Sequence, residues 1–290
     1  MNYKCQEASG PWQKKARPAT LLLLIAVLVS ACGTVPKSGV SPPTAPSKDG
    51  APANPSDISS LPEPTPRVEP LSKYGNPPSY TVFGQTYTVM KSSAGYVERG
   101  IASWYGTKFH GQYTSSREPY DLYGFTAAHK TLPLPCYVQV TNLRNGHALI
   151  VRVNDRGPFV DNRLIDLSYA AASRLDILST GTGLVEVRVI DPTTTPAAPA
   201  QTEPTQVTAT PNLYLQVGAF QSSDNAERLR EKLLHQASTA NVAVQIVKAT
   251  LNDGALYRVR LGPMDNVEQA DSLSTLIHQL GLGEPHVVIH

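Results

Sequence analysis

The chain has 290 residues, enough for about two ordinary domains, and its 25 prolines are crowded into two stretches that divide it. A formal net charge of +2 without any long basic run argues against a nucleic-acid-binding protein, which normally carries a basic face. No cofactor is expected, because His110, His129 and His147 lack metal-ligand spacing.

Residues 1–31 have the composition of a secretory signal, with basic residues, a short apolar run and small residues at its end. The apolar run, Leu21 to Val29, is shorter than the about 20 residues that a membrane-spanning helix needs. The segment from Val29 to Cys32 is similar to a lipobox, in which the cysteine is acylated. A plain signal peptide with an incidental cysteine is the alternative. Because Gly33 and not aspartate follows, we expect anchoring in the outer membrane.

Residues 32–78 are rich in Pro, Ser, Thr and Ala and predict an extended tether. Residues 79–191 then form the first domain, whose lead-in from Tyr80 to Tyr96 predicts one or two short strands. Removal of the leader leaves Cys136 without a disulfide partner. We interpret it as a small packed side chain and not as a nucleophile.

Short apolar or alternating runs in the first domain predict β-strands at 101–105, 137–141, 148–153 and 185–190. Asn145-Gly146 predicts a hairpin turn, because both positions tolerate positive φ. Ser168 can cap a helix over Tyr169 to Leu175. Several short strands with one short helix favour a small β-barrel over a sandwich.

Residues 192–211 form a second linker, and residues 212–290 predict a βαββαβ module. We expect its strands at 213–217, 242–247, 256–261 and 286–289. One helix is capped by Ser223 or Asp224, and the other opens near Asp265 and Glu268 and ends at Gly281. With both helices on one face, the other sheet face is left free for a ligand.

Polar and aromatic residues are densest between Trp104 and Asp155. Four aromatic residues there have flat surfaces suited to stacking on sugar rings: Trp104, Tyr105, Tyr113 and Tyr120. Glu118 and Asp121 lie three residues apart in a loop. Glycoside cleavage needs a carboxyl group whose raised pKa lets it protonate the leaving oxygen, and coupling of these two like charges would raise the pKa of Glu118.

Two further residues have alternative interpretations. Asp155, before Arg156-Gly157-Pro158, is either an Asx-turn residue or part of the catalytic site. His129 is either catalytic or a hydrogen-bonded histidine of the barrel interior.

The strings GIASWYG, FHG, TAAHKTLPLP, VTNLRNG, VRVNDRGPF and RLIDLS between Gly100 and Asp191 resemble the rare lipoprotein A (RlpA) family. The resemblance implies a six-stranded double-psi β-barrel. The strings YLQVGAF, NAERLREKL and YRVRLGP resemble a SPOR domain over residues 212–290. An RNA-binding βαββαβ module is the alternative, which secretion disfavours.

The resemblance also implies a function. Family members are lytic transglycosylases that cut peptide-free (denuded) peptidoglycan strands without water, leaving 1,6-anhydro-N-acetylmuramic acid ends. It implies that Glu118 and His129 lie at the key active-site positions, with Asp121 beside them. We expect Glu118 to transfer the proton, His129 and Asp121 to orient or tune it, and Asp155 to support the site.

The same resemblance implies residues that bind glycan. In the barrel we expect substrate contacts from Trp104, Tyr105, Tyr120, Asn154 and Arg156. In the SPOR module we expect glycan contacts from Gln216, Phe220, Arg258 and Arg260. The expected partners are denuded strands at the division septum, the outer membrane through Cys32, and septal division proteins.

One residue departs from the family pattern. Arg117 stands where the family usually has glycine, before Glu118. If this position has positive φ, arginine is strained there by about 1–2 kcal/mol. A guanidinium beside Glu118 would stabilise its ionised form and so weaken Glu118 as an acid. Two other functions therefore stay open: a non-catalytic, expansin-like wall binder and a structural septal lipoprotein.

Overall fold

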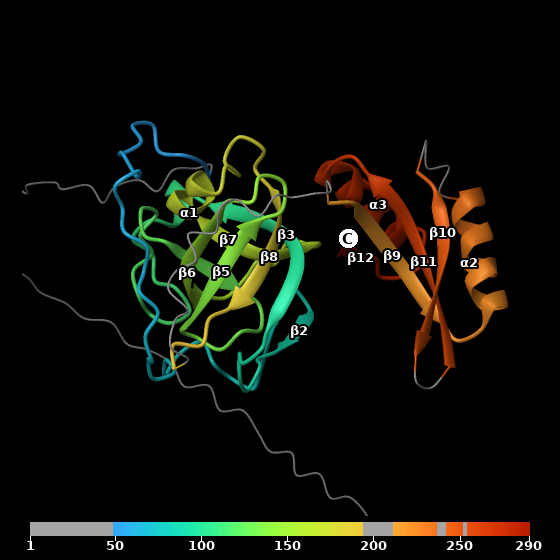
Figure 1. Cartoon of the computed structure of the whole chain (residues 1–290), viewed down its shortest axis with the longest axis horizontal. Helices are drawn as coiled ribbons and strands as arrows, with labels where there is room; N and C mark the ends of the chain where they lie inside the picture. The colour runs from blue at the N-terminus through green and yellow to red at the C-terminus, as the bar shows by residue number, and fades with distance from the viewer. Residues whose placement is uncertain (1–48, 194–210, 237–241, 252–253) are drawn as a thin grey trace, which may run out of the picture. The chain divides into compact units, whose positions relative to one another are not determined.

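The computed structural model describes residues 49–193, 211–236, 242–251 and 254–290 (Figure 1). The predicted signal peptide, Cys32, the first part of the tether and most of the second linker lie outside these residues. Within the described part, no helix combines the length and apolar character needed to cross a membrane.

Six strands close the first domain into a barrel (Figure 1). They are β3 (Val97–Tyr105), β4 (Thr126–His129), β5 (Cys136–Asn142), β6 (Ala148–Asp155), β7 (Arg163–Ser168) and β8 (Gly183–Val189). Around the barrel the order is β3-β7-β4-β6-β5-β8, with β3–β7 and β4–β6 parallel and the other pairs antiparallel. The predicted six-stranded barrel is confirmed.

The barrel interior is filled by one face of each strand. Val138 and Val140 of β5, Val151 and Val153 of β6 and Leu167 of β7 are fully buried. This alternation is what the sequence pattern detected in β5 and β6. The short strands β4 and β7 lie within the family-like strings but not among the predicted runs.

A short helix, α1 (Tyr169–Arg174), follows β7 and packs on the barrel. The Oγ atom of Ser168 accepts a hydrogen bond from the backbone N–H of Ala171 at 3.2 Å, which confirms the predicted cap. A single 3₁₀ turn, η1 (Thr107–Phe109), lies between β3 and the loop that carries Glu118.

The lead-in was predicted to form one or two short strands, and it forms two, β1 (Ser79–Val82) and β2 (Gln85–Thr88), which pair with each other. Residues 58–76, here called the strap, differ from the prediction of a free tether, because they lie along the barrel. Ile58 and Leu61 pack against its core, and Nη2 of Arg174 donates to their backbone carbonyls at 3.2 and 3.1 Å. Irregular backbone is held here by hydrogen bonds, which hydrophobic periodicity does not reveal.

The C-terminal module confirms the βαββαβ prediction. Its elements are β9 (Leu213–Phe220), α2 (Ser223–Gln236), β10 (Val244–Leu251), β11 (Gly254–Met264), α3 (Val267–Gln279) and β12 (His286–Ile289). The sheet is antiparallel with the order β10-β11-β9-β12. Both helices share a core with Leu215 and Leu261. Asn266, and not Asp265, caps α3 by accepting from Gln269 N at 2.8 Å.

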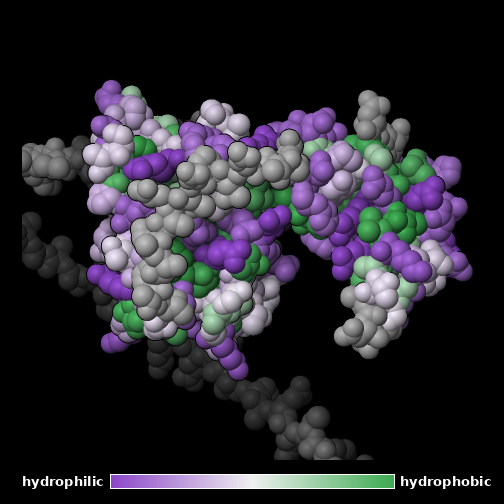
Figure 2. Space-filling view, in the orientation of Figure 1, coloured by the Kyte–Doolittle hydropathy of each residue, from purple (hydrophilic) through white to green (hydrophobic). Residues whose placement is uncertain are grey.

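On the face drawn in Figure 2, apolar residues occur in small groups among polar ones. Large exposed apolar side chains such as Val160 and Tyr113 are scattered along the barrel sequence. The surface that matters for function is therefore best sought among polar side chains.

Candidate active site

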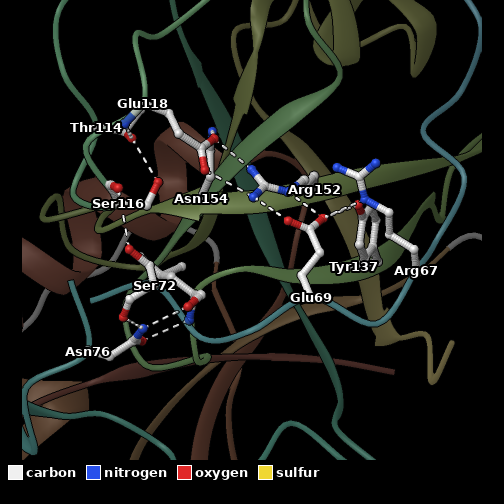
Figure 3. A network of polar contacts seen from close by, with 11 residues as sticks. Arg67, Glu69, Ser72, Asn76, Thr114, Ser116, Glu118, Tyr137, Arg152 and Asn154 are labelled. Atoms are coloured by element: carbon white, nitrogen blue, oxygen red, sulfur yellow. Dashed lines mark hydrogen bonds and ion pairs between the residues drawn. The ribbon is translucent and has the colours of Figure 1, made fainter. Parts of the chain in front are cut away.

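Glu118 lies in a turn that opens with Thr114, whose carbonyl accepts from Arg117 N at 2.9 Å. The Glu118 carboxylate faces two side chains of β6 (Figure 3). Its Oε2 accepts from Arg152 Nη1 at 2.6 Å and from Asn154 Nδ2 at 2.9 Å, and its Oε1 accepts from Arg152 Nη2 at 3.0 Å. Alternate residues of a strand share a face, so Arg152 and Asn154 hold the carboxylate together. The Glu118 side chain is still 40% exposed.

The electrostatic setting of Glu118 is opposite to the one expected. Burial disfavours its ionised form, but the hydrogen bonds and charge of Arg152, with Asn154 and Ser116, outweigh burial and lower its pKa. Glu118 is therefore an ionised carboxylate at neutral pH. It is poorly suited to donate a proton.

Asp121 is not coupled to Glu118 in the expected way. Its side chain is 62% exposed, and its Oδ1 accepts from Tyr123 N at 3.0 Å and lies 3.9 Å from His110 Nδ1. The prediction of a like-charge pair is wrong, because the turn directs the two carboxylates to different partners.

Arg117 has φ of 68°, so this position requires the left-handed conformation that glycine adopts readily. The expected strain is confirmed. The expected contact is not: the guanidinium of Arg117 lies over the ring of Tyr74, 5.3 Å from its centroid. The guanidinium paired with Glu118 belongs to Arg152.

Asp155 anchors the Glu118 loop. Its Oδ1 accepts from both the backbone N and the Oγ of Ser115 at 2.7 Å, and from Arg156 N at 2.7 Å. This geometry favours the turn interpretation over a direct chemical role, and it agrees with the expectation that Asp155 supports the site.

His129 is a hydrogen-bonded interior residue, 2% exposed. Its Nδ1 accepts from the backbone N–H of Thr131 and Leu132 at 3.2 and 3.1 Å, and its Nε2 pairs with Tyr96 Oη at 2.9 Å. Burial, with the nearby charges of Arg156 and Lys130, lowers the pKa of His129 to about 3. Among the described contacts none joins His129 to Glu118, so a direct partnership in proton transfer is not found.

Asp166, which the sequence analysis did not identify, is a carboxyl whose pKa is shifted in the opposite direction to that of Glu118. Burial, aided by the charge of Asp155, raises its pKa, and the opposing effects of Ser103, Arg163 and Lys130 do not cancel this. Its Oδ1 accepts from Ser103 Oγ, whereas its Oδ2 has no partner in the described part of the chain. The signal was present in the sequence as a single acid between apolar Ile165 and Leu167 of β7.

The strand register places Asp166 near Asp155, the residue that anchors the Glu118 loop. Ala128 of β4 pairs with Asp155 on β6 on one side and with Asp166 on β7 on the other. Ser103 of β3 pairs with Asp166 in turn. These paired residues form one row across four neighbouring strands. The row connects Asp166, whose pKa is raised, to Asp155, which holds the Glu118 loop.

The expected sugar-stacking residues are only partly available. Tyr105 and Tyr120 are 8% and 3% exposed, with ring centroids 4.1 Å apart, and Tyr120 Oη donates to Tyr105 O at 2.7 Å. They form core, so their prediction as substrate contacts is wrong. Trp104 is half-buried against Tyr169. Tyr113 is 71% exposed and forms a β-bridge with Pro119, the residue that follows Glu118, so it is an accessible ring close to the Glu118 turn.

Arg156 was also expected to bind substrate, but its guanidinium is occupied within the protein. Nε donates to Gly75 O at 2.8 Å, Nη1 to His129 O and Leu132 O at 3.1 and 2.5 Å, and Nη2 to Asn76 Oδ1 at 3.1 Å. Arg156 therefore joins the strap to the barrel. The N–H groups of its planar guanidinium donate to three backbone carbonyls and to the side-chain amide of Asn76.

Cys136 packs against the barrel core, and burial raises the pKa of its thiol to about 12. A protonated buried thiol is a weak nucleophile, in line with the sequence interpretation. Elsewhere in the described residues, no three His, Cys, Asp or Glu side chains gather as a candidate metal site.

In the C-terminal module, Gln216 and Arg260 lie together on one sheet face. Arg260 Nε donates to Gln216 Oε1 at 3.2 Å, and Arg260 Nη1 lies 2.5 Å from His290 Nε2. Arg258 shares this face by strand alternation. Phe220 does not: its ring packs over Gly218 and against the core, next to Leu229 of α2.

Comparison with known proteins agrees with both folded parts. A family model described as "Lytic transglycolase" matches residues 97–189, and a SPOR domain model matches residues 209–288. A protein named endolytic peptidoglycan transglycosylase RlpA from Pseudomonas aeruginosa strain UCBPP-PA14 is 40% identical over 325 residues. That alignment covers 91% of this chain and 94% of the relative.

Two further similarities concern a second relative and one solved structure. The protein of the same name from Vibrio cholerae serotype O1 is 40% identical over 234 residues, covering 81% of this chain and 83% of its own. The crystal structure of the RlpA SPOR domain from Pseudomonas aeruginosa is 38% identical, with a TM-score of 0.24, and covers 26% of this chain and 96% of its own. With such identity over nearly the whole length, the chain belongs to the RlpA family of endolytic peptidoglycan transglycosylases.

Proposed function

We propose that the protein cleaves the β-1,4 bond after N-acetylmuramic acid in peptide-free glycan strands and leaves a 1,6-anhydro end. The observation that carries this proposal is the strand register, which places Asp166 in one row with Asp155, the residue that holds the Glu118 loop. The two carboxyls, Asp166 and Glu118, also have opposite pKa shifts. The pKa of Asp166 is raised and that of Glu118 is lowered. Such separation is how glycoside-cleaving sites assign acid and base roles.

Asp166 is the proton donor in this proposal. Its protonated carboxyl, whose Oδ1 accepts from Ser103 Oγ, donates to the glycosidic oxygen as the bond from that oxygen to C1 breaks. The 6-hydroxyl of the same muramic acid then bonds to C1, and its proton passes to the Asp166 carboxylate. The acid is thereby regenerated, no water is consumed and no covalent enzyme intermediate forms.

Glu118 has a different part. Its ionised carboxylate is 40% exposed and stabilises the positive charge that develops on the sugar ring in the oxocarbenium-like transition state. This revises the expectation that Glu118 itself transfers the proton. Tyr113, the exposed ring in the same loop, supplies a surface for stacking on a neighbouring sugar.

The two carboxyls can be tested separately with the purified full chain and amidase-treated sacculi. Wild type is expected to release anhydro-ended fragments, and Asp166→Asn to lower kcat by about 10³-fold or more, because proton donation is lost. Glu118→Gln is expected to lower kcat by about 10²-fold. Asp161→Asn, an exposed acid on the β6–β7 connection, is the control. Unchanged sacculi with tight binding by wild type would instead support a non-catalytic wall binder.

The C-terminal module is proposed to bind denuded strands and to recruit the protein to the division septum. The supporting feature is the face that carries Gln216, Arg258 and Arg260. Gln216 and Arg260 are buried, at 9% and 6% exposed, and hydrogen-bonded to one another, whereas Arg258 is only half-buried. Arg258→Ala is expected to weaken binding to amidase-treated sacculi with the module still folded. Phe220→Ala is expected to lower stability by about 1–3 kcal/mol, because its ring covers the core. Septal localisation that survives Arg258→Ala would contradict this assignment.

Anchoring in the outer membrane through an acylated Cys32 is the remaining part of the proposal. It rests on the similarity of residues 29–32 to a lipobox. Cys32→Ser is expected to abolish incorporation of labelled palmitate and to release the protein from the membrane fraction. Labelling that persists in this variant would exclude Cys32 as the acylated residue.

A further inference from the structure

One guanidinium joins two carboxylates in the active site. Arg152 binds Glu118 as described, and it also binds Glu69 of the strap, with Nε to Oε1 at 3.0 Å and Nη2 to Oε2 at 2.9 Å (Figure 3). Tyr137, the partner of Arg152 across β5 and β6, donates its Oη to the same Glu69 carboxylate. Glu69 therefore holds the Nε–Nη2 edge of the guanidinium, and Glu118 holds the neighbouring Nη1–Nη2 edge.

The strap supports the Glu118 loop residue by residue. An ideal Cβ on Gly75 would lie 2.9 Å from the carbonyl oxygen of Ser115, so the two backbones touch. Ser72 Oγ donates to Ser116 O at 3.3 Å, and the ring of Tyr74 lies under Arg117. Three successive residues before Glu118 thus rest on the strap.

The strap is itself fixed to the barrel beside this loop. Ser72 N and Asn76 Nδ2 both donate to Leu134 O, at 2.9 and 2.7 Å, and Leu134 N donates to Asn76 Oδ1 at 2.8 Å. Because the Glu118 side chain remains 40% exposed, these contacts support the loop without covering its carboxylate.

We infer that Glu69 is a positioning residue that acts through Arg152 on Glu118, and that residues 69–76 of the strap are part of the catalytic unit. The inference rests on the proposed role of Glu118. The family model begins at residue 97 and so leaves the strap out. Nothing in the Pro-rich composition of this segment indicates that it reaches the site.

Charge balance explains why a second acid is useful. Arg152 alone would neutralise Glu118 in a one-to-one pair. With Glu69 also bound, the Arg152 guanidinium is shared between two carboxylates, so it neutralises Glu118 less completely than in a one-to-one pair. Arg67, 74% exposed, lies with its Nε 3.4 Å from Glu69 Oε1 and balances the charge of Glu69 in turn. Two bidentate contacts also hold the guanidinium plane in one orientation.

The test uses the full chain with Glu69→Gln and with Glu63→Gln as the matched control. Glu63 lies on the same strap and accepts from Ile150 N, but it does not contact Arg152. Glu69→Gln is expected to lower kcat by about 10- to 100-fold with little change in KM, because orientation and charge at Glu118 are lost. The acidic limb of its pH profile should also move to lower pH. Without the Glu69 carboxylate, the charge of Arg152 acts on Glu118 alone and lowers the pKa of Glu118 further.

A second pair of variants tests the backbone contact. Gly75→Ala and Gly84→Ala place the same side chain at φ of 78° and 83°, but only Gly75 has a neighbour within 4 Å, the Glu118 loop and Leu134. We expect Gly75→Ala to lower kcat and Gly84→Ala to leave it unchanged at equal folded fraction. If wild type is active and Glu69→Gln has the same kcat and pH profile, the role of Glu69 is wrong but the proposed function stands. If wild type is inactive on amidase-treated sacculi, the proposed function itself is wrong.

Discussion

Asp155 and Ser115 connect the end of β6 to the loop that carries Glu118, through two hydrogen bonds of 2.7 Å to the same carboxylate oxygen. Ser115 precedes Glu118 by three residues, within a turn that contains one strained residue, Arg117. The position of the Glu118 carboxylate therefore depends on an acid that does not touch it.

Asp155→Ala should release this loop. We expect a loss of about 1–3 kcal/mol in the free energy of unfolding, because Ser115 and Arg156 lose a charged acceptor. Activity should fall by about 10- to 100-fold through displacement of Glu118. Chemical denaturation and fragment release from sacculi measure the two effects. Asp121→Ala, at an exposed acid of the same region, should change both little; full activity in Asp155→Ala would contradict the anchoring role.

The pH profile of kcat/KM should be bell-shaped. The lowered pKa of Glu118 means that its required ionised form is lost only in acid. The raised pKa of Asp166 means that its required protonated form is lost as the pH increases above that value. Activity is thus expected to increase with pH through the first pKa and to decrease through the second. Glu118→Gln should abolish the acidic limb and retain the alkaline one, and the reverse assignment would contradict these roles.

Glu69 should contribute to acid stability. Its hydrogen bonds to Arg152 lower its pKa from 4.5 to about 2. A group with a lowered folded-state pKa stabilises the protein above its unfolded value and loses this effect as the pH falls through the folded value. The difference in Tm between wild type and Glu69→Gln should therefore be full above about pH 4.5 and shrink towards pH 2. A difference that does not depend on pH would exclude the ion pair as its origin.

His129→Ala should act mainly on folding. It leaves the backbone N–H groups of Thr131 and Leu132 buried without their acceptor, which costs about 1–3 kcal/mol for each. Because the pKa of His129 is about 3, wild-type activity should show no transition near the usual histidine value. Urea denaturation measures the loss. A His129→Ala variant of wild-type stability without activity would mean that His129 takes part in the chemistry.

Strand positions were predictable wherever one face is buried. Buried Val138 and Val140 flank half-buried Gln139, and buried Leu213 and Leu215 flank half-buried Tyr214 in the second module. The strands β4 and β7 were harder, because β4 has four residues and both have neighbours on two sides of a small barrel. Their apolar runs are too short for a period to be measured.

The site was only partly predictable for a different reason. The loop with Glu118 and the support by Asp155 were identified, but the side chains that hold the Glu118 carboxylate were not: Asn154 was expected to bind substrate and instead donates to Glu118. Arg152 is one polar residue of an alternating strand, and nothing local links it to Glu118. Tyr105 and Tyr120 looked like ligand surfaces because an aromatic side chain has the same sequence signature in a core as in a binding site.

The pairing order of the barrel has a consequence for how the chain folds. The first strand, β3, has β7 and β8 as its neighbours, which are the last two strands of the domain. Until about residue 168 has been synthesised, both barrel neighbours of β3 are missing or incomplete. Because β3 pairs with strands far away in the sequence, closing the intervening loop is expected to be the slow step of folding. We therefore expect the barrel to form cooperatively, after β7 and β8 are available. The Glu118 loop then becomes ordered only after the whole domain is complete.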